Sequence, residues 1–276
     1  MCRPRGVYPV GPLVVAASDP LGLASVSSTA GPVNSLVVYP AVEDLVGFPE
    51  ILGRNLAVRA HRPEQAQQGG EEFYTLRDYE HGDDLRRIHW PSSARQDRLM
   101  IRQLDTPWQA RSLVVLDVRP GGSSSAFETT VSGAASVIRH LSASGFETSL
   151  WAGGGSPIRV GKRSNDYARA MEALAEVAHH PRIDFASLAT RLRNQGGGGM
   201  LVVATSNPDS TLLGLARVLA AEYPTAVMLI CGEPDTGMGQ LHRAGVVTVT
   251  TSPGEPWAPA WNQAMRKTWH AASVGS

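Results

Sequence analysis

The chain has 276 residues, of which 42% are hydrophobic and 18% charged, and its formal net charge at pH 7 is zero. This length and composition are typical of a folded protein with one large domain or two smaller ones. A nucleic-acid-binding protein normally carries a basic excess that neutralises phosphates, so the balanced charge argues against nucleic acid as a partner.

Two further classes of protein are disfavoured by the same numbers. Cys2 and Cys231, the two cysteines, are too few for a disulfide framework or for a four-ligand zinc site. The apolar runs are far shorter than the ~20 residues of a membrane-spanning helix, and the start of the chain lacks the apolar block of a signal peptide. We therefore expect a chain without a membrane span, located in the cytoplasm.

The first part of the chain is predicted to be β structure. Residues 5–40 contain the β-branched runs VYPVGPLVVAAS and SLVVYP, separated by the turn-forming clusters DPLGL and STAGPVNS. We expect residues 1–46 to form a small, β-rich, sandwich-like lobe that packs on the rest of the protein. Residues 47–110 are expected to hold a linker, with the polar AQQGG as its most mobile piece, followed by a charged segment.

The charged segment, residues 71–102, contains seven acids, six arginines and no lysine, interleaved with apolar residues. Folding of those apolar residues would draw charges away from water, and a buried charge needs a partner. Arginine suits this role because its planar guanidinium can hold a carboxylate with two parallel hydrogen bonds. The pattern favours a structural set of arginine–carboxylate pairs.

Two catalytic hypotheses for the same segment stay open. Asp83 and Asp84 with His89 could form the centre of a metal-dependent hydrolase, although the neighbouring arginines would weaken their attraction for a cation. Ser92 and Ser93 beside His89 resemble a nucleophile with its base, although serines next to a proline commonly form turns.

From residue 111 onward, strand and helix patterns alternate. The apolar runs SLVVLDV, FETSLWAG, GMLVVATS, TAVMLIC and VVTVT predict strands, and residues 127–145, 164–180, 184–195, 210–224 and 255–273 have helical spacing. Because the strands are continuous apolar runs, we expect an α/β domain over residues 111–272, with a mostly parallel sheet covered by helices on both faces.

Candidate ligand positions gather at the carboxyl ends of those strands, where open α/β sheets bind ligands. Asp117, the TSNPD loop at 205–209 and the GEPDTGMG loop at 232–239 fall there. Asp117 could be a magnesium ligand, but a lone carboxylate is more typical of a loop or helix cap. The glycine-rich loops at 153–156 and 196–199 lack the spacing of a phosphate-binding loop. His179 and His180 are predicted to cap a helix end.

The charged segment is similar to the signature of a bacterial and archaeal family known as domain of unknown function fifty-eight. The resemblance rests on a long, irregularly spaced motif of residues in this chain: Glu72-Phe73, Leu76-Arg77, Tyr79, Gly82-Asp83-Asp84, Arg86, Ile88-His89-Trp90, Ser93-Ala94-Arg95, Leu99 and Arg102.

The resemblance implies a fold like that of the von Willebrand factor type A domain and no established enzymatic activity. It also implies genomic pairing with a MoxR-type AAA ATPase in chaperone-like assembly or maturation. Family members commonly begin with membrane helices, which makes the inner membrane face a second candidate location. The family fold usually binds a metal through a DxSxS motif, but here Asp117 is followed by Val118-Arg119-Pro120-Gly121, and Thr205-Ser206 stand where a later Asp is expected.

Because Arg119 would place a positive charge where the cation should sit, we expect no metal and no cofactor. The sequence thus predicts a non-enzymatic adaptor with a MoxR-type ATPase as its partner. Its structural segment comprises Glu72, Phe73, Arg77, Tyr79, Gly82, Asp83, Asp84, Arg86, His89, Trp90, Ala94, Arg95 and Arg102, and Asp117, Thr205 and Ser206 form the candidate binding face. A further alternative places function in the 205–209 and 232–239 loops alone.

Overall fold

A computed structural model describes most of the chain. The described residues are 4–49, 74–78, 88–96, 98–104, 111–153, 156–161, 164–180, 190, 199–221, 223, 225–232 and 238–274. No helix among them is long and apolar enough to cross a membrane.

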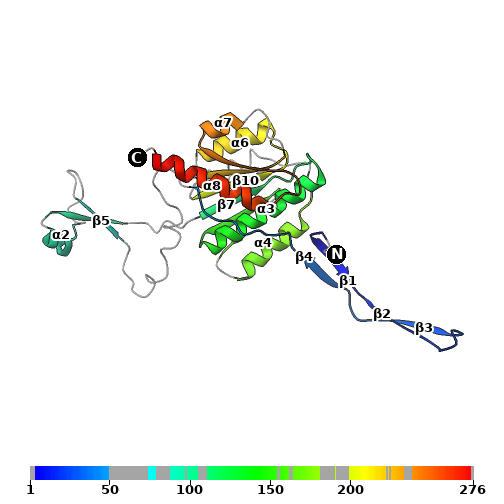
Figure 1. Ribbon diagram of the computed structural model, residues 1–276. Helices are drawn as coiled ribbons and strands as arrows, with labels where there is room; N and C mark the ends of the chain where they lie inside the picture. Colours follow the sequence, from blue (N-terminus) through cyan, green and yellow to red (C-terminus); the bar gives the residue numbers. More distant parts are fainter. Residues whose placement is uncertain are drawn as a thin grey trace.

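A six-stranded sheet organises the second half of the chain (Figure 1). Its strands lie in the order β12-β11-β10-β7-β8-β9, and all neighbouring pairs are parallel except β8 with β9. Their bounds are β7 Arg111–Leu116, β8 Glu147–Ala152, β9 Ile158–Val160, β10 Met200–Thr205, β11 Thr225–Cys231 and β12 Val246–Thr251. The mostly parallel sheet confirms the predicted α/β class, and the short antiparallel β9 is an edge strand that the sequence did not predict.

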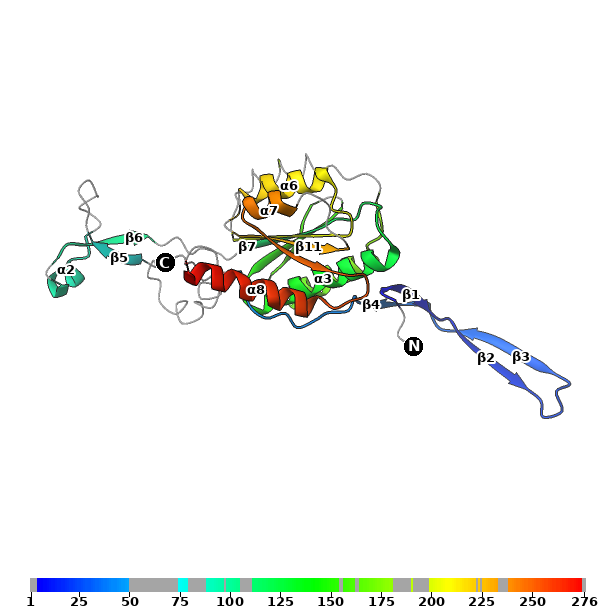
Figure 2. The same cartoon turned by 45° about the horizontal axis from the view of Figure 1, so that its top comes forward.

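Helices cover both faces of this sheet, as predicted. On one face lie α3 (Ser124–Ala143), α4 (Ser164–Glu176) and α8 (Trp257–Val274), and on the other lie α6 (Ser210–Ala220) and α7 (Met238–Arg243) (Figures 1 and 2). Each face of the sheet has its own hydrophobic core, and alternate residues of a strand point into one or the other. In β7, Val114 and Leu116 face α3, whereas Leu113 and Val115 face α6. Burial on both faces explains why the strands are unbroken apolar runs.

Residues 41–49 have no regular secondary structure and pack on α3 and α8. The Glu43 carboxylate accepts hydrogen bonds from the backbone amides of Trp257 and Ala258, at 2.9 and 2.8 Å, and so caps the start of α8. The Gly47 carbonyl faces His140 of α3 at 3.0 Å. The boundary predicted between residues 46 and 47 therefore falls inside a segment that packs as one piece on the α/β domain.

The N-terminal residues form β structure, as predicted, but not a sandwich. β1 (Gly6–Val10) pairs with β4 (Asn34–Val38), and β2 (Leu13–Ser18) pairs with β3 (Ser25–Ala30), so each sheet has two antiparallel strands. Together they make one long hairpin, which we call the ribbon, and Figures 1 and 2 show its outer half pointing away from the α/β domain. The sandwich-like packing was a wrong prediction, because the strands described between residues 4 and 49 form a single layer.

A third group of elements comes from the charged segment. β5 (Tyr74–Asp78) pairs antiparallel with β6 (Met100–Leu104), and the short helix α2 (Trp90–Gln96) lies beside β6. The sequence did not predict these elements. The helix predicted at 184–195 lies outside the described residues apart from Thr190.

Candidate functional site

The strand order places one pair of neighbours, β7 and β10, at a reversal of the winding. The chain leaves β7 into α3 on one face and leaves β10 into α6 on the other face, so the two crossovers diverge between these strands. Such a topological switch point is where open α/β sheets bind ligands. Asp117 directly follows β7, Thr205 ends β10 and Ser206 comes next, so the predicted binding-face residues gather at this point.

Arg119 fills the switch point with its guanidinium group. Its Nε and Nη2 donate to the two Asp117 carboxylate oxygens, both at 2.9 Å, in a bidentate pair. Its Nη1 and Nη2 donate to Asp209 at 2.7 and 3.0 Å, and Nη2 also lies 3.3 Å from the Asn207 carbonyl oxygen. One cation therefore joins the loop after β7 to the loop after β10.

Asp117 has no acceptor capacity left for a ligand. Its Oδ1 accepts from the backbone amide and Nε of Arg119, and its Oδ2 accepts from Nη2 of Arg119 and from the Thr205 hydroxyl at 2.9 Å. A carboxylate offers about four lone-pair positions, and here all are taken. Because the side chain is also only 1% exposed, this geometry does not suit Asp117 to act as a general base or as a metal ligand.

The electrostatics agree with a permanent ion pair. Hydrogen bonds to Asp117 raise the pKa of Arg119 further above its already high value, against the opposing effect of burial. Burial alone would raise the pKa of Asp209, but hydrogen bonds from Arg119 and from the Leu212 amide outweigh it and lower that pKa. Both groups stay charged at neutral pH, so the guanidinium is a built-in cation at the switch point.

The two loops are packed closely enough to hold this geometry. Gly122 has φ +73°, and a Cβ atom there would stand 2.9 Å from the Ser206 carbonyl oxygen, so the position favours glycine on both counts. Ser123 then caps α3 by accepting from the Ala126 amide. His179 supports the loop from outside, with Nδ1 3.0 Å from the Arg119 carbonyl oxygen. His179 thus contacts the switch-point loop in addition to following α4, where the sequence predicted a cap.

Asp209 is the residue of this candidate site that the sequence analysis did not single out. It lies in the TSNPD loop, which was placed at this edge, but its role as the second partner of Arg119 depends on contacts 90 residues apart. Its local signal was the start of α6: Asp209 accepts from the Leu212 amide at 2.9 Å, which is the spacing of a helix N-cap.

The described part of the charged segment brings His89 and Ser92 within hydrogen-bond distance at the start of α2. His89 precedes α2, and its Nδ1 lies 2.7 Å from the Ser92 hydroxyl and 3.3 Å from the Ser92 amide. The buried Ser93 hydroxyl donates to the His89 carbonyl and accepts from the Met100 amide, which ties α2 to β6. These contacts favour a structural role for His89.

Three of the predicted structural residues of this segment are exposed. Trp90 is 65% exposed, and Ala94 and Arg95 are exposed as well. The prediction that Trp90 anchors the segment and that Arg95 belongs to a buried pair is therefore wrong for the described residues. Arg77 lies opposite Ile101 and Arg102 opposite Leu76 in the β5–β6 ladder. The remaining predicted residues lie outside the described residues: Glu72, Phe73, Tyr79, Gly82, Asp83, Asp84 and Arg86.

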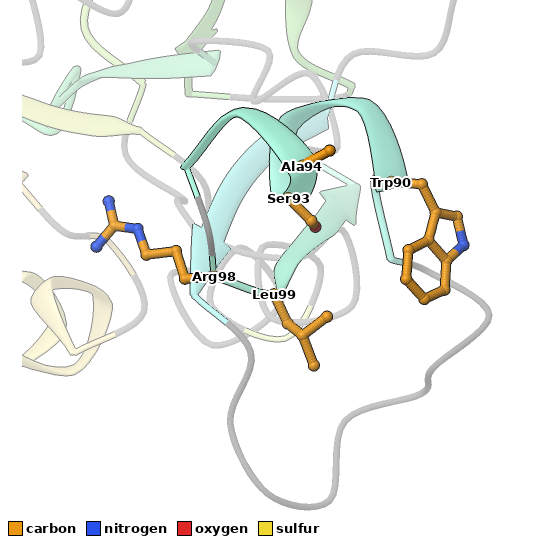
Figure 3. A pocket seen from close by; sticks show the side chains of 5 residues that line it. All are labelled: Trp90, Ser93, Ala94, Arg98 and Leu99. Carbon is orange, nitrogen blue, oxygen red and sulfur yellow. The ribbon is translucent and has the colours of Figure 1, made fainter.

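A shallow hollow of about 380 Å³ lies beside α2 (Figure 3). Trp90, Ser93, Ala94, Arg98 and Leu99 line it. The Ser93 hydroxyl is already bonded to two backbone groups, so Arg98 is the charged side chain that the lining offers to a ligand. Among the residues that the structure describes, no three or more His, Cys, Asp or Glu side chains are grouped to hold a metal.

Comparison with known proteins supports the family resemblance. The model of a family described as "Protein of unknown function DUF58" matches residues 75–194, from β5 to beyond α4 and including Asp117 and Arg119. None of the curated proteins compared with the sequence matches it. A solved structure titled "crystal structure of AibC" is 11% identical with a TM-score of 0.28; the alignment covers 60% of this chain and 44% of that one.

Proposed function

We propose that the protein is a non-enzymatic adaptor that binds a protein partner at the carboxyl edge of its sheet. The observation that carries the proposal is the Arg119 guanidinium, bridging Asp117 and Asp209 at the position where a sheet of this kind takes a ligand. A guanidinium that holds both carboxylates in place supports a fixed surface at the described part of this edge.

The finer fold assignment belongs to the same proposal. The strand order, counted along the chain from β7, is 3-2-1-4-5-6, with an antiparallel third strand at the edge. This arrangement supports a von Willebrand factor type A-like domain, and Asp117 occupies the position of the first metal-coordinating residue of that fold. In this chain the internal guanidinium takes the place of the divalent cation, so partner binding is expected to be independent of metal.

The partner that we propose is a MoxR-type AAA ATPase. The support is the resemblance of residues 75–194 to the family, which implies genomic pairing with such an ATPase. On this proposal the protein works in the chaperone-like assembly or maturation of a client, from the cytoplasm or the inner face of the membrane.

Helix α3 offers a matched pair of variants, because its two ends lie at opposite edges of the sheet. Ser124, in its first turn, is exposed at the carboxyl edge beside the switch point, and Ala143, its last residue, is exposed at the other edge. Replacing either by arginine adds the same bulk and charge to the same helix.

We expect the ATPase encoded in the same organism to co-purify with the wild-type chain and with Ala143→Arg, but not with Ser124→Arg, in buffer containing EDTA. Circular dichroism melting checks that both variants are folded. Equal retention of the ATPase by both variants would move the interface away from this edge, and failure of the wild-type chain to retain it would refute the partner.

The hydrolase alternative has its own test. Calorimetric titration with magnesium, manganese and zinc should give no micromolar binding to the wild-type chain. Micromolar binding that Asp83→Asn abolishes would instead establish the Asp83, Asp84 and His89 centre.

A further inference from the structure

The outer half of the ribbon has one apolar face and one polar face. In the β2–β3 register, Leu13 lies opposite Ala30, Val15 opposite Ser28, and Ala17 opposite Val26, so these six side chains share one face. Five of the six are apolar, against only two of six on the other face, which consists of Val14, Ala16, Ser18, Ser25, Ser27 and Thr29. This is the pattern of a sheet with one buried face.

That apolar face is nevertheless open to solvent. Leu13, Val15 and Val26 are 64%, 52% and 70% exposed. The turn at the tip, which Asp19 closes by accepting from the Leu21 and Ala24 amides, adds Leu21 and Leu23, both more than 80% exposed. A two-stranded hairpin is at best marginally stable in water by itself, so this layer requires a cover.

The α/β domain holds the base of the ribbon and does not cover its outer half. Arg5, just before β1, pairs with Glu128 of α3 at 2.8 Å and donates to the Leu174 and Ala175 carbonyls of α4. The Arg5 side chain is 7% exposed, so the attachment is buried. β1 and β4 contact α4, and β2 and β3 extend away from the α/β domain beyond them (Figures 1 and 2).

Charge decides which partner suits the face. Between residues 6 and 42 Asp19 is the single formally charged side chain, and its carboxylate is occupied by backbone amides. The face has no feature that would select an acidic or basic partner or an anionic lipid surface. An uncharged apolar face meets an identical copy of itself without like-charge repulsion, and symmetric self-association is the commonest form of assembly.

We propose that the outer ribbons of two copies of this chain pack face to face through Leu13, Val15 and Val26 around a two-fold axis. The second copy supplies the missing layer and completes a small two-layer β structure. Apolar side chains bury on the order of 100 Å² each, so this face and the tip leucines give about 600 Å² per copy. That area is at the low end for specific interfaces, so we expect a dissociation constant in the micromolar range.

Two adjacent valines provide the test. Val15 lies on the apolar face and Val14 on the polar face, with similar exposure of 52% and 61%. Sedimentation equilibrium of the full chain should show a monomer–dimer equilibrium that Val15→Glu weakens by roughly 100-fold or more, because a carboxylate would be buried without a partner. Val14→Glu should leave the equilibrium within about threefold of wild type, and both variants should melt like wild type because neither touches the core.

Three results would overturn the proposal. The first is a wild-type chain that stays monomeric at several hundred micromolar. The second is equal weakening by both valine variants, which would indicate pairing through the backbone edges of the ribbon. The third is a monomeric wild-type chain that sediments with neutral phosphatidylcholine vesicles and loses this property in Val15→Glu, which would assign the face to a lipid surface.

Discussion

Replacing Arg119 by methionine should be among the most damaging changes at the carboxyl edge of the sheet. Methionine keeps much of the side-chain length but removes every guanidinium donor to the Asp117 and Asp209 carboxylates. Asp117 is only 1% exposed and would keep its charge with the Thr205 hydroxyl and the residue 119 backbone amide as its remaining partners. Breaking a buried pair from one side typically costs about 3–5 kcal/mol.

The expected loss is at the lower end of that range, about 3 kcal/mol, because two donors to Asp117 survive and because Asp209 is 38% exposed and can be hydrated. Urea unfolding followed by circular dichroism at pH 7 measures it directly. The double variant with Asp117→Asn removes the stranded charge, so we expect it to recover at least ~1 kcal/mol of the loss in a double-mutant cycle. The reasoning is refuted if the single variant loses less than about 1 kcal/mol or if the double variant is no more stable than the single one.

Three other predictions concern the packing around α3 and α8. Glu43→Ala should destabilise the chain by about 1 kcal/mol in urea unfolding, because two amides at the start of α8 lose their acceptor; an unchanged midpoint would contradict this. Gly133→Ala should cost about 1–3 kcal/mol, because a Cβ atom there would stand 2.7 Å from the Trp257 ring; wild-type stability would show that the ring can shift. Burial lowers the pKa of His140, whose ring stacks on Phe48 with the ring centres 4.5 Å apart. As the pH falls, the unfolded chain therefore takes up the His140 proton before the folded chain does. The free energy of unfolding should accordingly decrease below about pH 6.5. His140→Phe should flatten that fall between about pH 7 and pH 5, and an unchanged slope would remove His140 as its source.

The sequence predicted the α/β domain well because a strand that is buried on both faces is a continuous apolar run, which can be recognised locally. Runs such as MLVVAT and TAVMLIC are apolar at nearly every position, and they became β10 and β11 in the centre of the sheet. Asp117 could be placed at the carboxyl edge of the sheet for the same reason, since it directly follows such a run. The position of Arg119 two residues later was enough to predict a positive charge there.

The ribbon and the charged segment were harder to predict because the deciding contacts are not local. LVVAAS is almost as apolar as a buried strand, yet β2 is exposed along its whole length, because exposure depends on whether a second layer is present. Glu43 caps a helix that begins 214 residues later, and no spacing in the sequence indicates that contact. In the charged segment, a dense mixture of arginines and aromatic residues suggested burial, whereas α2 turns Trp90 and Arg95 outward.

The switch point and the base of the ribbon are joined by one continuous line of contacts. The Arg5 guanidinium lies 5.5 Å from the centre of the Phe127 ring, that ring lies 4.0 Å from the His179 ring, and His179 contacts the Arg119 carbonyl oxygen. Phe127 belongs to α3, Arg5 donates to backbone carbonyls of α4, and His179 follows the end of α4. The switch point and the base of the ribbon are therefore both attached to the first turns of α3 and the last turn of α4. A dimer formed through the ribbons would hold two switch points in one assembly, and a partner with repeated binding sites would bind such a pair more tightly than a single copy.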